Sequence, residues 1–403
     1  MIGSPRAWEL LDLAFRWVHV IAGIMWVGNS MLFNWLDRTL SPSSKPGPGM
    51  LGESWLLHSG GFYFVEKSQL VGRPLPRTLH WFKWQAYTTW LSGAALLVAV
   101  YYVGGRAAMA DASVAPLSHG TAVLVGVGSI LGGVGLYDAV QRFLAPRMPR
   151  LANAVLLVAF VAIVYALTHL LNGRAAFIHV GALLASIMAA NVAHTIVPSQ
   201  RELVGTFTGA GGANPAVSAR AKRVSITNNY VTFPVIALMV SSHFPSLYAQ
   251  RLSWVVLLLI VLCGATVRHI MNVRYTFTAW VPALASTVVV AFAALWALIS
   301  LGTAPAPAAA SAAVPSNVTF AEARHVIDRR CAACHSLAPS DSTFGAAPAG
   351  VAFDLPAQIQ SHAARIRERA VVQKSMPPAN KTHITEQERL ILGAWIDGGA
   401  KVP

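Results

Sequence analysis

Long apolar segments separated by short polar loops fill most of the first 301 residues. Each has about the 20 residues that an α-helix needs to cross the hydrocarbon core of a bilayer. Eight such segments lie at about 8–36, 82–104, 117–140, 151–172, 175–198, 228–244, 252–272 and 278–301. The sixth is the weakest, because it is short and interrupted by Pro234. The first is too long an apolar run for a signal peptide, and no small-residue cleavage site follows it.

The pattern changes after the last apolar segment. Residues 302–317 are rich in Pro and Ala, which is typical of a semi-rigid spacer. Beyond it, Thr319-x-x-Glu322 and Thr385-x-x-Glu388 read as capping boxes, each opening a helix. The second helix carries an apolar stripe formed by Leu390, Ile391, Ala394 and Trp395. The sequence therefore predicts an all-α protein with a polytopic membrane domain at 1–301, a linker at 302–317 and a small helical domain at 318–403.

The motif Cys331-Ala-Ala-Cys334-His335 lies in this last domain. C-x-x-C-H is the attachment site of a c-type haem, in which the two sulfurs bind the haem covalently and the histidine ligates the iron. A thioredoxin-like redox pair or half of a zinc site would need a βαβ pattern or a second Cys pair, and the sequence has neither. The remaining cysteine, Cys263, stands alone in an apolar segment and reads as a core residue.

The surroundings of the motif resemble a class I cytochrome c. A helix precedes the motif, a methionine follows in Ser375-Met376-Pro377-Pro378, and an aromatic helix closes the domain. The resemblance implies that Met376 is the second axial ligand of a haem c held by Cys331, Cys334 and His335. A thioether opposite histidine raises the reduction potential of the iron.

Charge predicts the orientation in the membrane. Only 11% of the 403 residues are charged, and the net charge of +14 is spread between apolar runs, which makes nucleic acid a poor partner. Haem c is attached outside the cytoplasm, so the C-terminus belongs on the periplasmic side of a bacterial inner membrane, and eight spans place the N-terminus there too. Four basic residues fall in the predicted periplasmic segments and fifteen in the cytoplasmic ones, as the positive-inside rule requires. The fifteen are Arg38, Lys45, Lys67, Arg73, Arg77, Lys83, Arg142, Arg147, Arg150, Arg201, Arg220, Lys222, Arg223, Arg268 and Arg274.

We single out seven of the histidines that lie in or at the edge of the spans: His19, His80, His169, His179, His194, His243 and His269. Ionisable residues at membrane depth are costly and are functional candidates. We expect some of them to ligate one or two b-type haems, with the pairing open; interfacial or hydrogen-bonded histidines are the alternative. His179 and His194 share one span. In a regular helix they would be roughly 22 Å apart along the axis and would face broadly the same way.

The chain as a whole resembles the bacterial membrane-bound urate hydroxylases (PuuD type). The resemblance rests on Trp26-Val-Gly-Asn-Ser30, Gly60-Gly-Phe-Tyr63, Leu79-His-Trp-Phe-Lys-Trp-Gln-Ala86 and Thr89-Trp90, followed by the spans and the C-x-x-C-H domain. It implies oxidation of urate to 5-hydroxyisourate with oxygen from water. It also implies that electrons leave through haem c to a periplasmic cytochrome c or a terminal oxidase.

The residue that removes a proton from urate is not identified by the sequence. The candidates are His58, Glu66 with Lys67, and Lys83 beside His80. A solvated loop pair (Glu66 and Lys67) and an interface anchor (Lys83) are the ordinary interpretations. Two other functions fit the same features. One is a quinol-oxidising or other respiratory electron-transfer subunit, and the other is a transporter or sensor with a haem-regulated tail.

Overall fold

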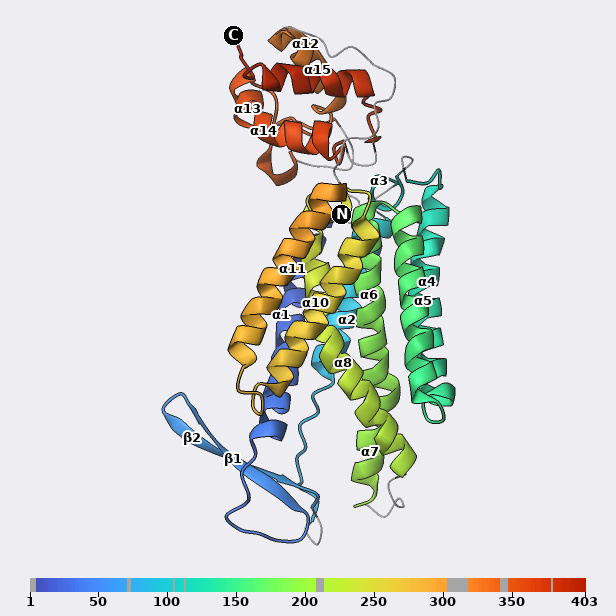
Figure 1. The fold of residues 1–403 in the computed structure, drawn as a ribbon, viewed down its shortest axis with the longest axis vertical. Coiled ribbons are helices and arrows are strands. Elements are labelled where there is room, and N and C mark those ends of the chain that lie inside the picture. Colours follow the sequence, from blue (N-terminus) through green and yellow to red (C-terminus); the bar gives the residue numbers. More distant parts are fainter. Residues whose placement is uncertain are drawn as a thin grey trace.

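A bundle of long helices forms the main body of the molecule (Figure 1). The computed structural model describes residues 5–70, 74–103, 106–111, 114–207, 214–302, 318–340, 347–377 and 380–403. A two-stranded sheet lies beyond one end of the bundle, called here the hairpin end, and the helices of the C-terminal part lie beyond the opposite end.

The bundle contains long helices joined by shorter ones. Its helices are α1 (Pro5–Thr39), α2 (Trp84–Leu97), α3 (Arg106–Met109), α4 (His119–Ala139), α5 (Pro149–Leu170), α6 (Gly173–Asn191), α7 (Val197–Gly205), α8 (Pro215–Ser241), α9 (Pro245–Tyr248), α10 (Ser253–Val273) and α11 (Trp280–Gly302). The π-helical segments Val98–Tyr102, Val140–Leu144 and Val192–Ile196 extend α2, α4 and α6.

Seven helices in the described part of the chain are long and apolar enough to cross a membrane. They correspond to seven of the eight predicted spans, as expected for a membrane protein. The second predicted span, α2 with its π-helical extension, is not among the seven, because its first turns carry Trp84, Gln85 and Thr88 among the apolar residues. It still runs through the bundle, since it connects the hairpin at one end with α3 at the other (Figure 1).

Helix α6 occupies the centre of the bundle, where it packs against α2, α4, α5 and α8. Inside the protein, 67% of its most apolar window is buried, compared with 6% for α1 and 0% for α11. A helix that is apolar all round is a buried helix. The apolar surfaces of α1 and α11 are left facing outward, as lipid-facing helices require.

Pro234 does not end the sixth predicted span. The structure places it inside α8, which runs without a break from Pro215 to Ser241. Gly264 of α10 lies directly against it: a Cβ added to Gly264 would stand 2.8 Å from the Pro234 nitrogen. The sixth span is therefore confirmed but is longer than predicted, because Gly264 on the neighbouring helix leaves room for the proline ring.

The loop between the first two predicted spans contains β-structure, which corrects the all-α prediction. Strands β1 (Met50–His58) and β2 (Gly61–Ser68) pair antiparallel, with His58 opposite Gly61. Ser59 and Gly60 form the turn, both with positive φ (51° and 75°), as a two-residue hairpin turn requires. Trp55, Leu56 and Leu57 lie opposite Phe64, Tyr63 and Phe62, and cross-strand pairs of this kind stabilise a hairpin. The chain is mostly helical, with this one hairpin in the described residues.

The C-terminal part has its own core, separate from that of the bundle. Its elements are α12 (Phe320–Arg330), a 3₁₀ turn (Pro348–Gly350), α13 (Pro356–Ser361), α14 (Ala363–Ile366), a π-helical segment (Arg367–Val372) and α15 (Glu386–Asp397). Both predicted capping boxes are present, at Thr319 and at Thr385. Helices α12 and α15 pack together, and Trp395 is buried with its ring 5.8 Å from that of Phe320.

Candidate functional site

The C-x-x-C-H motif forms one tight turn at the end of α12. Cys331 caps the helix, and its carbonyl accepts hydrogen bonds from the backbone N–H of Cys334 (3.1 Å) and of His335 (2.9 Å). Burial, reinforced by the neighbouring Cys334, raises the pKa of the Cys331 thiol to about 12. The free thiol is therefore protonated at neutral pH, which disfavours a thiolate redox pair.

His335 is held in one orientation. Its Nδ1 lies 2.9 Å from the carbonyl oxygen of Val351, and its ring lies 5.1 Å from that of Phe353. Burial lowers the pKa of His335, so the imidazole is neutral. A neutral histidine with Nδ1 bonded to a carbonyl presents Nε2 to a metal, which is the usual arrangement of a metal-ligating histidine.

Met376 borders the same core as Cys331, so the fold brings both predicted haem-binding segments against one cluster of side chains. A residue that sequence reasoning missed holds the methionine loop. The Arg389 side chain on α15 is almost fully buried, and its Nη1 donates to the carbonyl oxygens of Ala370 and of Met376, the latter at 2.9 Å. In the sequence, its position one turn before Leu392, on the face of α15 that packs into the core, was the sign that Arg389 is buried. These residues fit a haem c.

The seven membrane histidines lie in different environments. His179 is fully buried and His19 half-buried, whereas His80, His169, His194, His243 and His269 are exposed on the surface of the bundle. His179 lies in the regular part of α6, whereas His194 lies in the π-helical segment Val192–Ile196 that extends it.

Two of the histidines have defined hydrogen bonds inside the bundle. His19 Nδ1 lies 2.9 Å from the Thr89 carbonyl, and the His19 ring lies against Gly93, where any Cβ would collide with it. His179 uses both nitrogens, with Nδ1 2.8 Å from the Ala175 carbonyl and Nε2 3.2 Å from the Tyr102 hydroxyl. His19 therefore fits the prediction of a haem b ligand, because its Nε2 has no hydrogen bond within the described residues. Nε2 of His179 could ligate an iron only after its contact with the Tyr102 hydroxyl is broken.

His119 lies near the start of the third predicted span but was not among the seven candidates. It begins α4, and its Nε2 lies 2.8 Å from the carbonyl of Tyr102, the residue that also contacts His179. Its Nδ1 is buried without a hydrogen-bond partner among the described residues. The three side chains come from separate segments, which is why no sequence spacing could reveal them.

The four predicted candidates for proton abstraction do not converge. His58 is exposed at the turn of the hairpin, while Glu66 pairs with Glu53 nearer the other end of the strands. Lys67 forms an ion pair with Asp37 of α1. Lys83 lies 5.6 Å from the ring centres of both Trp81 and Trp84, as an interface anchor would. These contacts favour structural roles for the two lysines.

A buried polar cluster joins α1, α8 and α10. At its centre is Arg268, which was counted among the basic residues of the cytoplasmic side but lies inside the bundle with 2% of its surface exposed. Its Nε donates to Asn229 Oδ1 (3.2 Å) and its Nη2 to Ser30 Oγ (3.3 Å). Asn272 Nδ2 donates to the same Asn229 oxygen at 2.6 Å. The guanidinium carbon is 5.2 Å from the centre of the Phe233 ring. We refer to these five residues as the Arg268 cluster.

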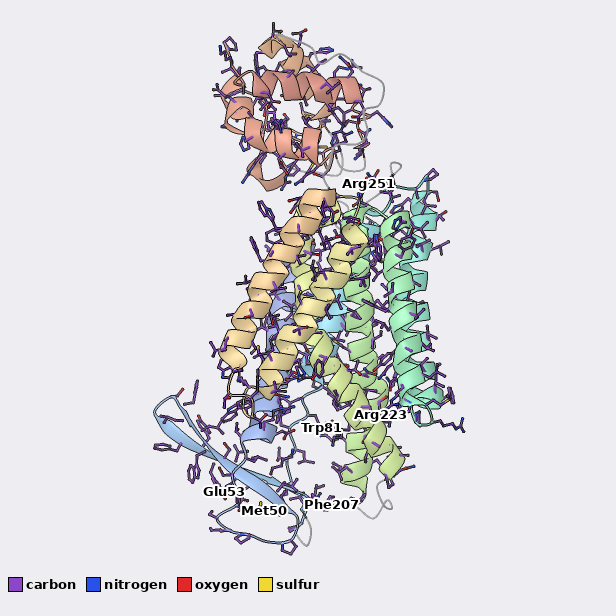
Figure 2. The ribbon with its side chains drawn as sticks, in the orientation of Figure 1. Met50, Glu53, Trp81, Phe207, Arg223 and Arg251 are labelled. Atoms are coloured by element: carbon purple, nitrogen blue, oxygen red, sulfur yellow. The ribbon has the colours of Figure 1, made fainter. Side chains whose placement is uncertain are left out.

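The Arg268 cluster was not predicted from the sequence, because Arg268 is close to the end of an apolar run, where basic side chains usually extend into water. In Figure 2, Arg251, just before α10, lies at the end of the bundle next to the C-terminal part. Trp81 and Arg223 lie at the hairpin end. Helix α10 ends at Val273, five residues after Arg268, so the guanidinium-bearing residue is about 8 Å inside the hairpin end of the helix.

Comparison with known proteins identifies the bundle. No curated protein and no solved structure matches the chain significantly. One family does match, and the matching residues begin at the start of α1 and end in α11, so the match takes in the Arg268 cluster and all seven histidines. On that match, over residues 5–299, the chain belongs to the family described as urate oxidase, N-terminal.

Proposed function

We propose that the protein is a membrane-bound urate hydroxylase that delivers electrons through its own C-terminal cytochrome c domain. The observation that carries the proposal is the joining, in one chain, of a urate oxidase-family bundle to a C-x-x-C-H turn whose histidine is already oriented by Val351. The family of the bundle points to urate as the substrate, and the C-x-x-C-H turn would hold a one-electron acceptor that replaces O₂.

The proposed reaction balances without O₂. Urate and one water give 5-hydroxyisourate, two protons and two electrons. The oxygen of the new hydroxyl comes from water, and the electrons leave to a soluble periplasmic cytochrome c or a terminal oxidase. In this chain Cys331 and Cys334 would bind the haem and His335 and Met376 would ligate its iron. When bound, a c-type haem supplies reversible one-electron transfer.

Transfer across the bundle needs a further redox centre, because the hydrocarbon core is about 30 Å thick. One or two b-type haems are proposed for this role. His19 is the best-supported ligand, since the Thr89 carbonyl orients its ring as a ligating histidine is usually oriented. A pyridine haemochrome assay that detects only c-type haem would refute this part of the proposal.

The proposed orientation puts the hairpin end in the cytoplasm and both chain ends in the periplasm of a bacterial inner membrane. The start of α1 and the end of α11 lie at the same end of the bundle, which supports it (Figure 1). Arg223, from the predicted cytoplasmic set, and Arg251, from the periplasmic set, lie at opposite ends (Figure 2). Urate would enter from the side that carries most of the basic residues, which attract an anion.

Isolated membranes containing the full chain provide the test. Addition of urate should reduce the haem c band, and H₂¹⁸O should label the product. Cys331→Ser should abolish urate-driven reduction of an added cytochrome c, whereas Cys263→Ser, the matched change at the lone cysteine of α10, should not. Reduction by quinol but not by urate would instead identify a respiratory subunit. No reduction by either would favour a transporter or sensor.

A further inference from the structure

Arg268 is a buried cation without a buried counter-ion. Among the described residues no Asp or Glu forms an ion pair with it, and its hydrogen bonds go to one amide and one hydroxyl. Two ionisable side chains act on it electrostatically: Arg274, which is also positive, and Tyr275, which is a phenol and not a carboxylate. Buried charges in proteins are normally paired, because an isolated ion in a medium of low dielectric constant is very unfavourable. The environment of Arg268 therefore lacks an anion.

The Arg268 cluster also lacks a hydrogen-bond donor. Asn272 is 3% exposed, and its Oδ1 is buried with no partner in the described part of the chain. Its Nδ2 is already used by Asn229. A simple anion such as chloride or phosphate would satisfy the arginine and leave this acceptor unpaired. The unpaired charge of Arg268 and the unpaired Oδ1 of Asn272 would both be satisfied by an anionic ligand that also carries an N–H donor.

We propose that the Arg268 cluster is the binding site of the urate anion. Urate is a flat heteroaromatic monoanion with carbonyl oxygens and ring N–H groups. The remaining N–H groups of Arg268 face its oxygens, Asn272 Oδ1 accepts a ring N–H, and the aromatic ring of Phe233 borders the plane of the guanidinium. Arginine suits such planar recognition because its donors lie in one rigid plane. The inference rests on the proposed function for the identity of the anion.

The contact between α8 and α10 limits how far into the bundle the proposed site extends. One turn deeper than Arg268, Gly264 of α10 lies directly against Pro234 of α8, too close for any Cβ between them. This contact closes the space between the two helices on the inner side. We therefore place the entry of urate at the hairpin end, about 8 Å away along α10, which is the side from which an anion attracted by the basic residues would arrive.

Urate binding should be measured on the full chain in nanodiscs of zwitterionic lipid, by equilibrium dialysis with radiolabelled urate. Arg268→Gln should weaken binding at least about 30-fold, as expected when one partner of a buried charged contact is removed. Arg251→Gln removes the same charge at the opposite end of the bundle and should bind urate as wild type does.

Asn272→Asp is a second variant, chosen to test the site in a protein that remains folded. The change keeps the size of the side chain and removes the hydrogen bond from Asn272 Nδ2 to Asn229, but it places a carboxylate beside Arg268 that offsets the loss, so the bundle should stay folded, with a melting temperature close to that of wild type. Because the carboxylate repels urate and occupies Arg268, urate affinity should fall by a similar factor. Wild-type urate affinity in either variant would overturn the proposal.

The outcomes separate this inference from the proposed function. If wild type binds urate and reduces its haem, but Arg268→Gln and Asn272→Asp do so equally well, the function stands and the site lies elsewhere. If Arg268 instead holds a lipid phosphate, Arg268→Gln will lower only the anionic lipid that copurifies, and the urate site is refuted. A wild-type protein that neither binds nor oxidises urate refutes both.

Discussion

Gly264→Ala is expected to force α8 and α10 apart. The new methyl carbon would stand 2.8 Å from the nitrogen, 3.0 Å from Cδ and 3.1 Å from Cα of Pro234. These are backbone and ring atoms that cannot rotate away. Ordinary contact begins at 3.4 Å, so the helices must separate by about 0.6 Å (3.4 − 2.8). Overpacking of this kind costs about 1–3 kcal/mol.

Gly128→Ala is the matched control. Gly128 lies inside α4, and nothing stands within 4 Å of a Cβ added there. Both substitutions gain the same helix propensity, up to about 1 kcal/mol, so this gain cancels when the two variants are compared. The difference in stability should therefore equal the overpacking cost. It should appear as a lower melting temperature of Gly264→Ala when both full-length variants are heated at one scan rate in the same detergent.

The separation should also reach the Arg268 cluster. Asn229 and Phe233 belong to α8, while Arg268 and Asn272 belong to α10, and a shift of about 0.6 Å would stretch the 3.2 Å contact between Arg268 and Asn229 beyond hydrogen-bond range. Arg268 and Asn229 would then no longer be oriented for the proposed anion, so urate affinity should also be weaker in Gly264→Ala than in Gly128→Ala. Equal melting temperatures for Gly264→Ala and Gly128→Ala would refute the reasoning.

Three further predictions concern the C-terminal part. Burial opposes ionisation of Glu388, but hydrogen bonds from the Thr385 backbone and from Arg330 lower its pKa; its contribution to stability is therefore complete above its unfolded pKa of about 4.3 and is lost as the pH falls through the lower folded value. Melting curves between pH 3 and 6 should show a smaller loss in Glu388→Gln than in wild type; some loss remains, because hydrogen bonds also lower the pKa of Glu322, Asp354 and Asp397. Arg389→Leu removes two charge-assisted hydrogen bonds from the methionine loop and should destabilise the domain by about 3 kcal/mol, seen as a lower midpoint in thermal unfolding. Met376→Ala should lower the reduction potential of the haem c in a spectroscopic titration, while Met148→Ala, at an exposed residue of the bundle, should leave it unchanged.

Regular periodicity made most of the helices predictable. Seven of the eight spans appear as helices long and apolar enough to cross a bilayer, and both capping boxes are formed, because length, hydropathy and capping are local properties of the chain. The hairpin was missed because its turn depends on two residues with positive φ, Ser59 and Gly60, which the residue pattern around it did not suggest. Pro234 was misjudged for a related reason, since its acceptance in α8 depends on Gly264 in another helix.

The sequence by itself determined the C-x-x-C-H motif: Cys331, Cys334 and His335 lie within five consecutive positions, so their identity and spacing can be read without a fold. Only the tertiary structure decided which other residues join a site. Arg389 reaches Met376 across the C-terminal core, and Arg268 meets Ser30, which is 238 positions away in the chain. The physical reason is that burial and hydrogen bonding depend on distance in space. Arg268 has the same side chain as a basic loop residue, and the packing of α1, α8 and α10 around it is what leaves its charge to be satisfied by an anion.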